Sequence, residues 1–406
     1  MTRPTRTALL AAGAGAALLL VSLGIWLGVS RLQVGRSDFT SIYVGATLLR
    51  DGHGAQLYDE AAQNGVHATL LAPGDHEGNL PYLNPPTAAL AAVPFTALSL
   101  PDAYRVWSLL QLVLVALGVA AAVRAAPWPQ ATPRHARLAT WTVATAGVGA
   151  ANTLFLGQWN GMLVLGVGLA YLCWRRDRAL AAGLLLGATA LLAKPHLFLG
   201  LAAFLLLRRD RRVLLGAAAA AVALAGLSLA LVGPQGVAGF VRITAADADR
   251  WPPSMLLGFS GLFGTVFGGT ATAHLLAAAA DVAAVAACGV LGARSREAGR
   301  FETCLAGTLA LSLAAAPHLL THDLVMLAPA AAFLLARAAQ LDGAGTPWPG
   351  PRSRRVLALW LLVNVAPLAG AAVPTGVLVP LVLTGLGAAA LRLTRDHRPV
   401  PALAGT

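Results

Sequence analysis

Residues 8–29 read ALLAAGAGAALLLVSLGIWLGV and contain no charged side chain. A helix needs about 20 apolar residues to cross the hydrocarbon core of a bilayer, so this segment is long enough to span a membrane. Arg3 and Arg6 precede it, as basic residues precede a secretory signal, but the run is longer than a typical signal and no small-residue cleavage motif follows it. We therefore expect an uncleaved membrane anchor.

The rest of the chain has the same apolar character. Of its 406 residues, 57% are hydrophobic and 11% are charged, and the mean hydropathy is +0.69; charged residues make up about a quarter of an ordinary soluble domain. Only helices or closed barrels satisfy their backbone polar groups in lipid, and the long Ala- and Leu-rich runs do not alternate as barrel strands do. The sequence predicts an all-α polytopic membrane protein with about 12 transmembrane helices, forming one domain over residues 1–406.

The net charge of +12 reflects topology and does not point to a nucleic-acid partner. Of the 29 Lys and Arg residues, 22 lie in seven short segments between apolar runs. These segments are residues 1–6, 124–137, 175–178, 208–212, 294–300, 337–355 and 392–398. If all seven face the cytoplasm, the chain obeys the positive-inside rule in a plasma membrane, with both termini inside.

On this topology residues 31–85 and 233–270 form two extracytoplasmic loops. The first is the most polar part of the chain, because residues 37–86 hold six of the 17 acidic residues. Within it, Phe39, Tyr43 and Ala46 recur at helical spacing, which indicates a short amphipathic helix on the membrane surface. We expect a second interfacial helix over residues 58–71.

Lys194 is the only lysine in the chain, and it lies between two cytoplasmic Arg clusters. The 29 residues 179–207 must therefore cross outward and return, with Lys194 at the tip of a hairpin of two short spans. A single span would leave Lys194 near the bilayer centre, at a cost of about 2.5–3.5 kcal/mol. The short spans suggest a thinned membrane or helices that stop at a cavity.

Polar residues that flank the predicted spans converge on the outer face. They are Asp38, Tyr82, Asn84, Gln158, Asn160, Lys194, His196, Arg242, Arg250, His318, His322 and Asp323. A carboxylate there can act as a general base on an acceptor hydroxyl, while cations stabilise a phosphate leaving group. The histidines and acids show no clean metal-ligand spacing, so we expect neither a cofactor nor an obligatory metal. Three cysteines without a CxxC spacing indicate no disulfide framework.

The order of short motifs resembles glycosyltransferase family 87, over most of residues 30–335. The motifs are Ser37-Asp38-Phe39, Tyr43, Gly52, Tyr58-Asp59, Tyr82, Pro85-Pro86, Pro94, Pro101, Trp107, Gly157-Gln158-Trp159-Asn160 and Lys194-Pro195. Members of that family are polytopic enzymes of the GT-C superfamily that use polyprenyl-phosphate sugars, including mannosyltransferases and arabinofuranosyltransferases of mycobacterial envelope synthesis. The resemblance implies a GT-C fold with an extracytoplasmic active site.

The resemblance also implies a role for Asp38, because in this superfamily an aspartate just after the first transmembrane helix serves as the catalytic base. The alternative is that Asp38 caps the helix that begins near Phe39, and the two roles do not exclude each other. For Lys194 we expect a contact with the carrier phosphate, which suits a compact ammonium. The alternative is a lysine that extends from a short helix to the interface.

Six further residues are predicted to bind substrate or phosphate: His322, Gln158, Asn160, Tyr82, Arg242 and Arg250. Structural roles remain open for several of them. Gln158 and Asn160 can equally cap two helices at a tight turn, and Arg242 and Arg250 can belong to an ordinary solvated loop. The sequence around His322 departs from the mannosyltransferase pattern of a Trp and paired His, because Leu320 and His322-Asp323-Leu324 stand there.

The predicted activity is inverting transfer of a hexose or pentose, such as mannose, from a polyprenyl-phosphate donor to a hydroxyl of an envelope lipid or glycan. A transporter or lipid flippase is the alternative; it predicts ionisable residues at mid-membrane, and Asp281 has that position in the apolar run 271–292. A third reading, an envelope assembly protein without catalysis, predicts that Asp38 tolerates substitution.

Overall fold

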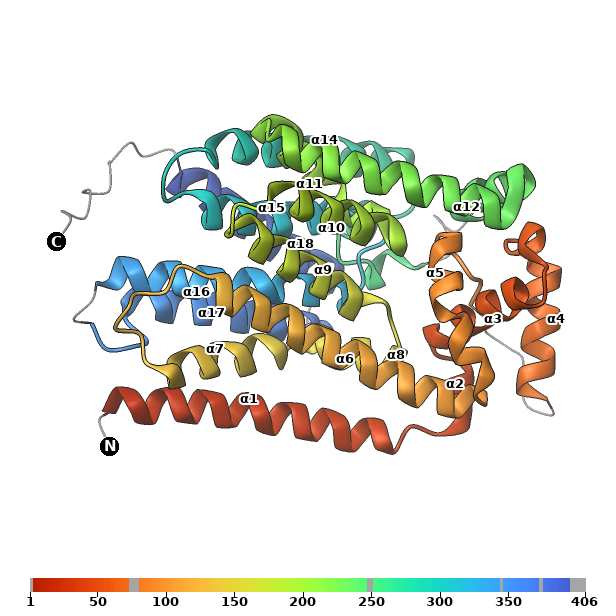
Figure 1. Ribbon diagram of the computed structural model, residues 1–406, viewed down its shortest axis with the longest axis horizontal. Helices are drawn as coiled ribbons and strands as arrows, with labels where there is room; N and C mark the ends of the chain where they lie inside the picture. The colour runs from red at the N-terminus through yellow and green to blue at the C-terminus, as the bar shows by residue number, and fades with distance from the viewer. Residues whose placement is uncertain (1–2, 73–79, 247–250, 344–345, 372–374, 395–406) are drawn as a thin grey trace.

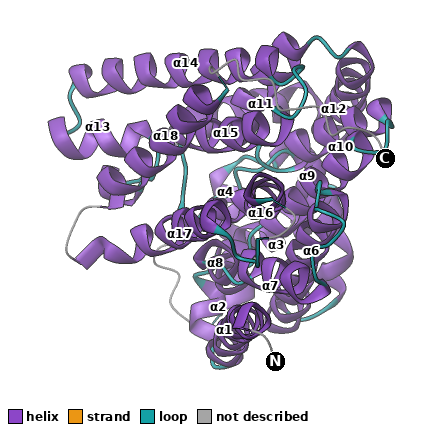
Figure 2. Cartoon of the chain, turned by 90° about the vertical axis from the view of Figure 1, so that its left-hand side faces the viewer, coloured by secondary structure: helices purple, strands orange, loops and turns teal. Residues whose placement is uncertain are grey.

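The computed structural model describes residues 3–72, 80–246, 251–343, 346–371 and 375–394. The described residues are 82% helical and include no strand, which confirms the predicted all-α class. Figure 1 shows α1 (Arg3–Leu27) along one edge of a bundle and α12 (Arg211–Ala246) with α14 (Ala271–Arg294) along the opposite edge. Figure 2, turned by 90°, keeps α1 and α14 at opposite edges.

Six helices of the described chain are long and apolar enough to cross a membrane. They are Arg6–Leu27 of α1, α6 (Leu100–Ala125), α12, α14, the continuous stretch of η6 (Thr321–Leu327) and α16 (Ala328–Asp342), and α18 (Thr375–Leu393). The predicted anchor at residues 8–29 corresponds to α1. The chain is therefore a multi-pass membrane protein.

Shorter apolar helices lie between these six. They are α5 (Pro86–Ala92) with η2 (Val93–Ala97), α9 (Asn160–Trp174), α10 (Ala179–Leu192), η3 (Pro195–Phe198) with α11 (Leu199–Arg208), and α15 (Phe301–Ala314). At 1.5 Å per residue, a helix of 14 residues is about 21 Å long and does not cross a 30 Å hydrocarbon core unaided. The count of about 12 crossings stays a prediction.

The other helices connect or cover the apolar ones. They are α2 (Arg31–Gly35), α3 (Asp38–Arg50), η1 (Gly54–Gln56), α4 (Glu60–Leu71), α7 (Arg134–Thr145), α8 (Val148–Leu156), η5 (Pro253–Met255), α13 (Phe259–Phe267), α17 (Pro351–Val365) and η7 (Ala366–Ala371). Of these, α2, α3 and α4 gather with α5 at one end of the bundle, far from the start of α1 (Figure 1).

Helices α3 and α4 form in the first predicted loop, but α3 does not lie open on a surface. Every residue from Phe39 to Leu48 is buried, and Tyr43 donates a hydrogen bond to the carbonyl of Leu98 at 2.8 Å. The spacing of Phe39 and Tyr43 identified one buried face of α3. The other faces of this helix carry polar or small residues, and they are buried because α4, α5 and η2 also pack against it. The position of α4 at the membrane interface stays a prediction.

The chain breaks between two short helices at Lys194, as the charge pattern predicted. α10 ends at Leu192, and η3 begins at Pro195, which cannot donate a backbone hydrogen bond to continue the helix. α10 packs closely on α12 because glycines face it: a β-carbon at Gly183 would lie 2.0 Å from the carbonyl oxygen of Val213. The break leaves Lys194 between the two helices, where it is 7% exposed.

The predicted loop over residues 233–270 is largely helical in its described part. α12 continues to Ala246 through a kink at Gly233, where φ is 64°, and the following Pro234 starts the second half. Asp247, Asp249 and Arg250 lie outside the described residues. Pro234 reads as a loop signal in sequence, yet it stands at the first position of a new helical segment, where proline is well tolerated.

Candidate functional site

A cavity of about 450 Å³ opens at the end of the bundle where α3, α12 and the break between α10 and η3 meet. Its polar lining includes Asp38, Gln158, Lys194, His196 and His322. The remaining residues that line it are Ser41, Ile42, Leu80, Pro81, Leu83, Asn84, Pro85, Ala193, Pro195, Phe240, Thr244, Trp251, Pro317, His318 and Leu320. Segments that are far apart in sequence therefore share one cavity.

Asp38 lies at the first position of α3, and it does not cap that helix. Ser37 is the N-cap residue and makes no capping bond with its side chain. The Asp38 carboxylate instead accepts a hydrogen bond at Oδ2 from Nε2 of Gln158 at 2.6 Å. The sequence left a base and a cap open as roles for Asp38, and the geometry leaves its carboxylate free for the cavity.

The environment of Asp38 favours the neutral acid more than water does. Burial raises the pKa of the Asp38 carboxyl above its ordinary value, whereas the Gln158 hydrogen bond and the charge of Lys194 lower it. The N-terminus of α3 also favours a carboxylate at this position through its helix dipole. A carboxyl whose pKa is raised is a stronger base once it is ionised, which suits a role in proton transfer.

Gly157 and an aromatic cluster hold Gln158 against Asp38. Gly157 ends α8 with φ 65°, and a β-carbon there would lie 2.6 Å from Cβ of Phe39, which follows Asp38 in the chain. Trp107 donates a hydrogen bond from Nε1 to the carbonyl of Gly157 at 2.8 Å and stacks edge to face with Trp159. Glycine meets both needs, the left-handed backbone and the close approach to Phe39.

In the same cavity, Lys194 lies between Asp323 and His322. Its Nζ donates to Oδ1 of Asp323 at 2.7 Å and to Nε2 of His322 at 2.8 Å. An ammonium has three donors and no acceptor, so Nε2 of His322 accepts, and this bond selects the neutral tautomer that carries its proton on Nδ1. One Nζ donor of Lys194 remains for a ligand in the cavity.

Asp323 was named among the converging polar residues but not predicted as part of the site, and the structure makes it the centre of this cluster. Oδ1 accepts from Lys194 and from Nδ2 of Asn160 at 2.9 Å, and Oδ2 accepts from the backbone N–H of Leu320 at 3.1 Å. With its carboxylate fully buried and fully bonded, Asp323 compensates the charge of Lys194. An acid one position after His322 was the available sequence signal.

Asn160 does not line the cavity. It is fully buried at the start of α9, and its Nδ2 donates to the carbonyl of His322 at 2.8 Å in addition to Asp323. Asn160 was predicted to bind substrate, but its side-chain amide instead links α9 to η6. Asn160 is a positioning residue for His322 and Asp323.

Tyr82 also lies away from the cavity, although its neighbours line it. The ring is fully buried and stacks on Tyr58, and the hydroxyl donates to the carbonyl of Pro85 at 2.7 Å. Tyr58 in turn donates to the carbonyl of Asn84 at 2.7 Å. The two tyrosines hold the segment that contains Asn84 and Pro85, which line the cavity. Tyr82 therefore supports the lining of the cavity without facing it.

Only one of the two predicted arginines lies within the described residues. Arg242 lies exposed on the second half of α12 and does not line the cavity, although Phe240 and Thr244 do, because two residues along a helix turn a side chain to a different face. Arg250 lies outside the described residues. Asp281 lies in α14 away from this cavity, and its Oδ1 has no hydrogen-bond partner in the described chain.

The cavity therefore contains two chemically different groups of side chains. Asp38 and Gln158 supply a carboxylate, whereas Lys194, His322, His196 and His318 are potential donors to an anion. Within the described ranges, no group of three or more His, Cys, Asp or Glu side chains is arranged to hold a metal ion. The arrangement can accept a proton at Asp38 and stabilise an anion at Lys194 within the same cavity.

Comparison with known proteins gives one family. The model of glycosyltransferase family 87 matches residues 82–317, more than half of the chain. The matched range includes Gln158, Asn160 and Lys194, and it excludes Asp38 and His322. No curated protein and no solved structure matches this chain.

Proposed function

Because this chain belongs to glycosyltransferase family 87, we propose that it transfers a sugar from a polyprenyl-phosphate carrier to a hydroxyl of an envelope glycolipid or glycan. The sugar is a hexose such as mannose, or a pentose. The reaction takes place at the extracytoplasmic face of the plasma membrane, in a GT-C type arrangement of about 12 crossings. Membership of the family itself confirms the resemblance that the short motifs indicated.

The observation that carries the proposal is that one cavity receives both Asp38 and Lys194. Glycosyl transfer from a phosphate carrier needs a base for the acceptor hydroxyl and a cation for the departing phosphate. Asp38 and Lys194 correspond to these two requirements. A site with only one of them would support binding of either substrate but not the transfer.

In the proposed reaction, Asp38 accepts the proton of the acceptor hydroxyl. The oxygen attacks the anomeric carbon from the side opposite the phosphate, so a new C–O bond forms as the bond to the phosphate oxygen breaks, with inversion. The electron pair of that bond leaves on the polyprenyl phosphate. The remaining Nζ donor of Lys194 stabilises the added charge, a role for which a compact ammonium is suited.

An apolar groove beside Lys194 supports a carrier with a long hydrocarbon chain. A cavity of about 310 Å³ lies between α10, α11 and α12 and is lined only by Ala, Gly, Leu and Phe side chains, among them Leu191 and Phe198. These two residues stand three and four positions from Lys194 on either side of the break. A polyprenyl chain in this groove would bring its phosphate to the lysine.

The direct test is transfer by the purified protein from a panel of polyprenyl-phosphate sugars, with products identified by mass. We expect one sugar to be transferred, with release of stoichiometric polyprenyl phosphate. Use of a nucleotide sugar without a lipid carrier would contradict the proposal. Binding of polyprenyl phosphate with no transfer to any acceptor in a cell-envelope extract would instead favour a transporter or flippase.

A further inference from the structure

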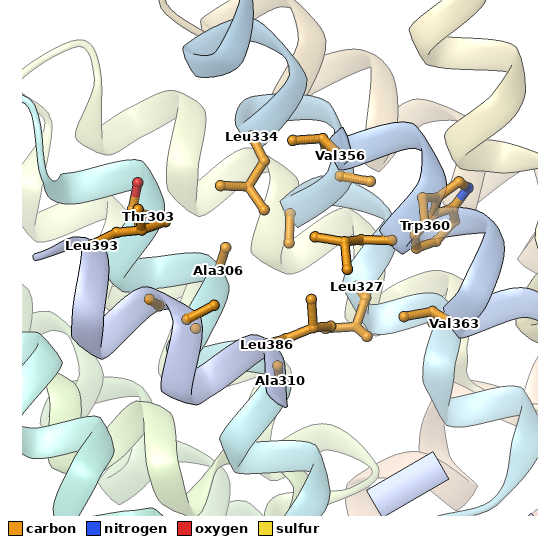
Figure 3. Close-up of a pocket in the computed structure, with 16 residues that line it drawn as sticks. Thr303, Ala306, Ala310, Leu327, Leu334, Val356, Trp360, Val363, Leu386 and Leu393 are labelled. Carbon is orange, nitrogen blue, oxygen red and sulfur yellow. The ribbon is translucent and has the colours of Figure 1, made fainter. Parts of the chain in front are cut away.

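A second apolar groove lies between α15, η6 with α16, α17 and α18, away from the cavity that Asp38 lines. It has a volume of about 150 Å³, and Figure 3 shows Leu327, Leu334, Trp360 and Leu386 around it. Thr303 is the one polar residue among the 16 that line it. Leu359 and Leu393, which are 42% and 72% exposed, mark where the groove opens to the surroundings of the protein.

A groove of this kind favours an apolar guest. Cavities of about 150 Å³ with apolar walls stay dry and take up hydrocarbon molecules, because a water molecule inside would lose its hydrogen bonds. In a bilayer the hydrocarbon at hand is the acyl chain of a lipid. The groove alone does not select one lipid over another, so the residues at its end decide the class.

Five arginines stand at the same end of the groove. Arg300, Arg337 and Arg352 lie three or four positions beyond the lining residues Thr303, Leu334 and Val356, so each stands about one helical turn further out. Arg355 directly precedes the lining residue Val356, and Arg392 directly precedes the lining residue Leu393, so these two stand at the rim of the groove. This end of the groove is therefore rich in positive charge.

Three of these five arginines contact other described residues, and two are available to bind a ligand. Arg300 is paired with Glu297, Arg337 donates to Gln340, and Arg352 donates to the carbonyl of Leu341. Arg355 and Arg392 are exposed, and neither makes a hydrogen bond or ion pair with a described residue. Each of these guanidinium groups can bind a phosphate without breaking a contact with a described residue.

We propose that this groove is a binding site for an anionic phospholipid. One acyl chain occupies the groove between α15, α16, α17 and α18, and Arg355 and Arg392 bind the headgroup phosphate. The arginines belong to segments that the positive-inside pattern assigns to the cytoplasm, so the lipid comes from the inner leaflet, where anionic headgroups attract basic residues. The site is separate from sugar transfer and does not depend on the proposed function.

Native mass spectrometry of the full-length protein in detergent tests the site, with phosphatidylglycerol and phosphatidylcholine of identical chains as probes. We expect phosphatidylglycerol to bind at least about 10-fold more tightly. The double variant Arg355→Gln/Arg392→Gln should bind phosphatidylglycerol about 30-fold more weakly, since each arginine near an anionic headgroup contributes about a factor of five in affinity. The matched control Arg176→Gln/Arg178→Gln removes two exposed arginines between α9 and α10 and should bind as the wild type does.

The groove is tested separately by Ala389→Phe, which fills its exposed wall, with Ala283→Phe on the exposed face of α14 as control. Ala389→Phe should weaken binding at least about 10-fold, and the control should not. Equal affinity for the two lipids, or unchanged binding by Arg355→Gln/Arg392→Gln, overturns the proposal. Full competition by glycerol 3-phosphate, or coverage of this face by a second copy of the chain, overturns it as well.

Discussion

Gln158 donates a hydrogen bond from Nε2 to Oδ2 of Asp38 at 2.6 Å, although 120 residues separate the two. This bond joins the start of α3 to the turn between α8 and α9. It occupies one carboxylate oxygen of Asp38, and no donor among the described residues takes the other. Oδ1 is therefore the oxygen of Asp38 that we propose accepts the proton of a bound hydroxyl.

Removal of this bond should change the pH dependence of transfer. The Gln158 hydrogen bond lowers the pKa of Asp38, which burial raises, so Gln158→Met should raise that pKa further. A base acts when ionised, so activity is lost as pH falls through the pKa. The acidic limb of kcat/KM should move to higher pH in Gln158→Met and should stay in place in the exposed control Gln56→Met. An unchanged limb in both would show that Asp38 does not titrate in the reaction.

The Lys194–Asp323 pair should separate stability from activity. Lys194→Met leaves the buried Asp323 carboxylate without its cation, at a cost of about 3–5 kcal/mol. Lys194→Met/Asp323→Leu removes both charges and should recover most of the thermal stability in detergent, because an apolar pair replaces a buried ion pair with little loss. Transfer should stay absent in both variants. Recovered transfer by the double variant would mean that Lys194 serves stability alone.

Gly157→Ala should disturb the site indirectly, by displacing the turn that positions Gln158. The new β-carbon would lie 2.6 Å from Cβ of Phe39, and the alanine would have to adopt the left-handed backbone conformation of this position. We therefore expect a loss of stability above about 1 kcal/mol together with reduced kcat. Gly226 is a matched control in α12 with open space around it, and Gly226→Ala should be neutral or slightly stabilising. Thermal unfolding and transfer assays of both variants check this. Equal behaviour of the two would contradict the proposed support of Gln158 by Gly157.

The side of the membrane on which the site lies can be checked by cysteine labelling in a background without Cys173, Cys288 and Cys304. Gln56→Cys, exposed in the first predicted outer loop, should react with a membrane-impermeant maleimide in intact cells. Ala131→Cys, exposed between α6 and α7, should react only after permeabilisation. The reverse pattern would place the cavity in the cytoplasm and exclude an extracytoplasmic transfer.

Sequence alone was sufficient for the features that depend on local composition. The helical class follows from long apolar runs, and the break at Lys194 follows from Arg clusters only 29 residues apart with a proline between them. The turn at Gly157 was also visible as a polar interruption between two apolar runs. These features need no knowledge of which helices are neighbours.

The features that sequence did not disclose depend on tertiary packing. Tyr82 and Asn160 were expected at the substrate, but each has neighbours that satisfy it inside the protein, and no local pattern shows which polar side chain faces a cavity. Asp323 is marked in the sequence only by its place next to His322, and its ion pair at 2.7 Å with Lys194, 129 residues away, depends on the fold. The same holds for α3, whose burial depends on α4, α5 and η2 covering it.

The central claim is that Asp38 is the base of a glycosyl transfer, and Asp38→Asn tests it most directly. Asparagine keeps the size and the contact with Gln158 but cannot take a proton. Single-turnover transfer by the purified variant should fall about 10²- to 10⁴-fold, the contribution of a general base, while thermal stability and donor binding stay at wild-type values. Transfer at the wild-type rate by a folded Asp38→Asn protein would contradict the account.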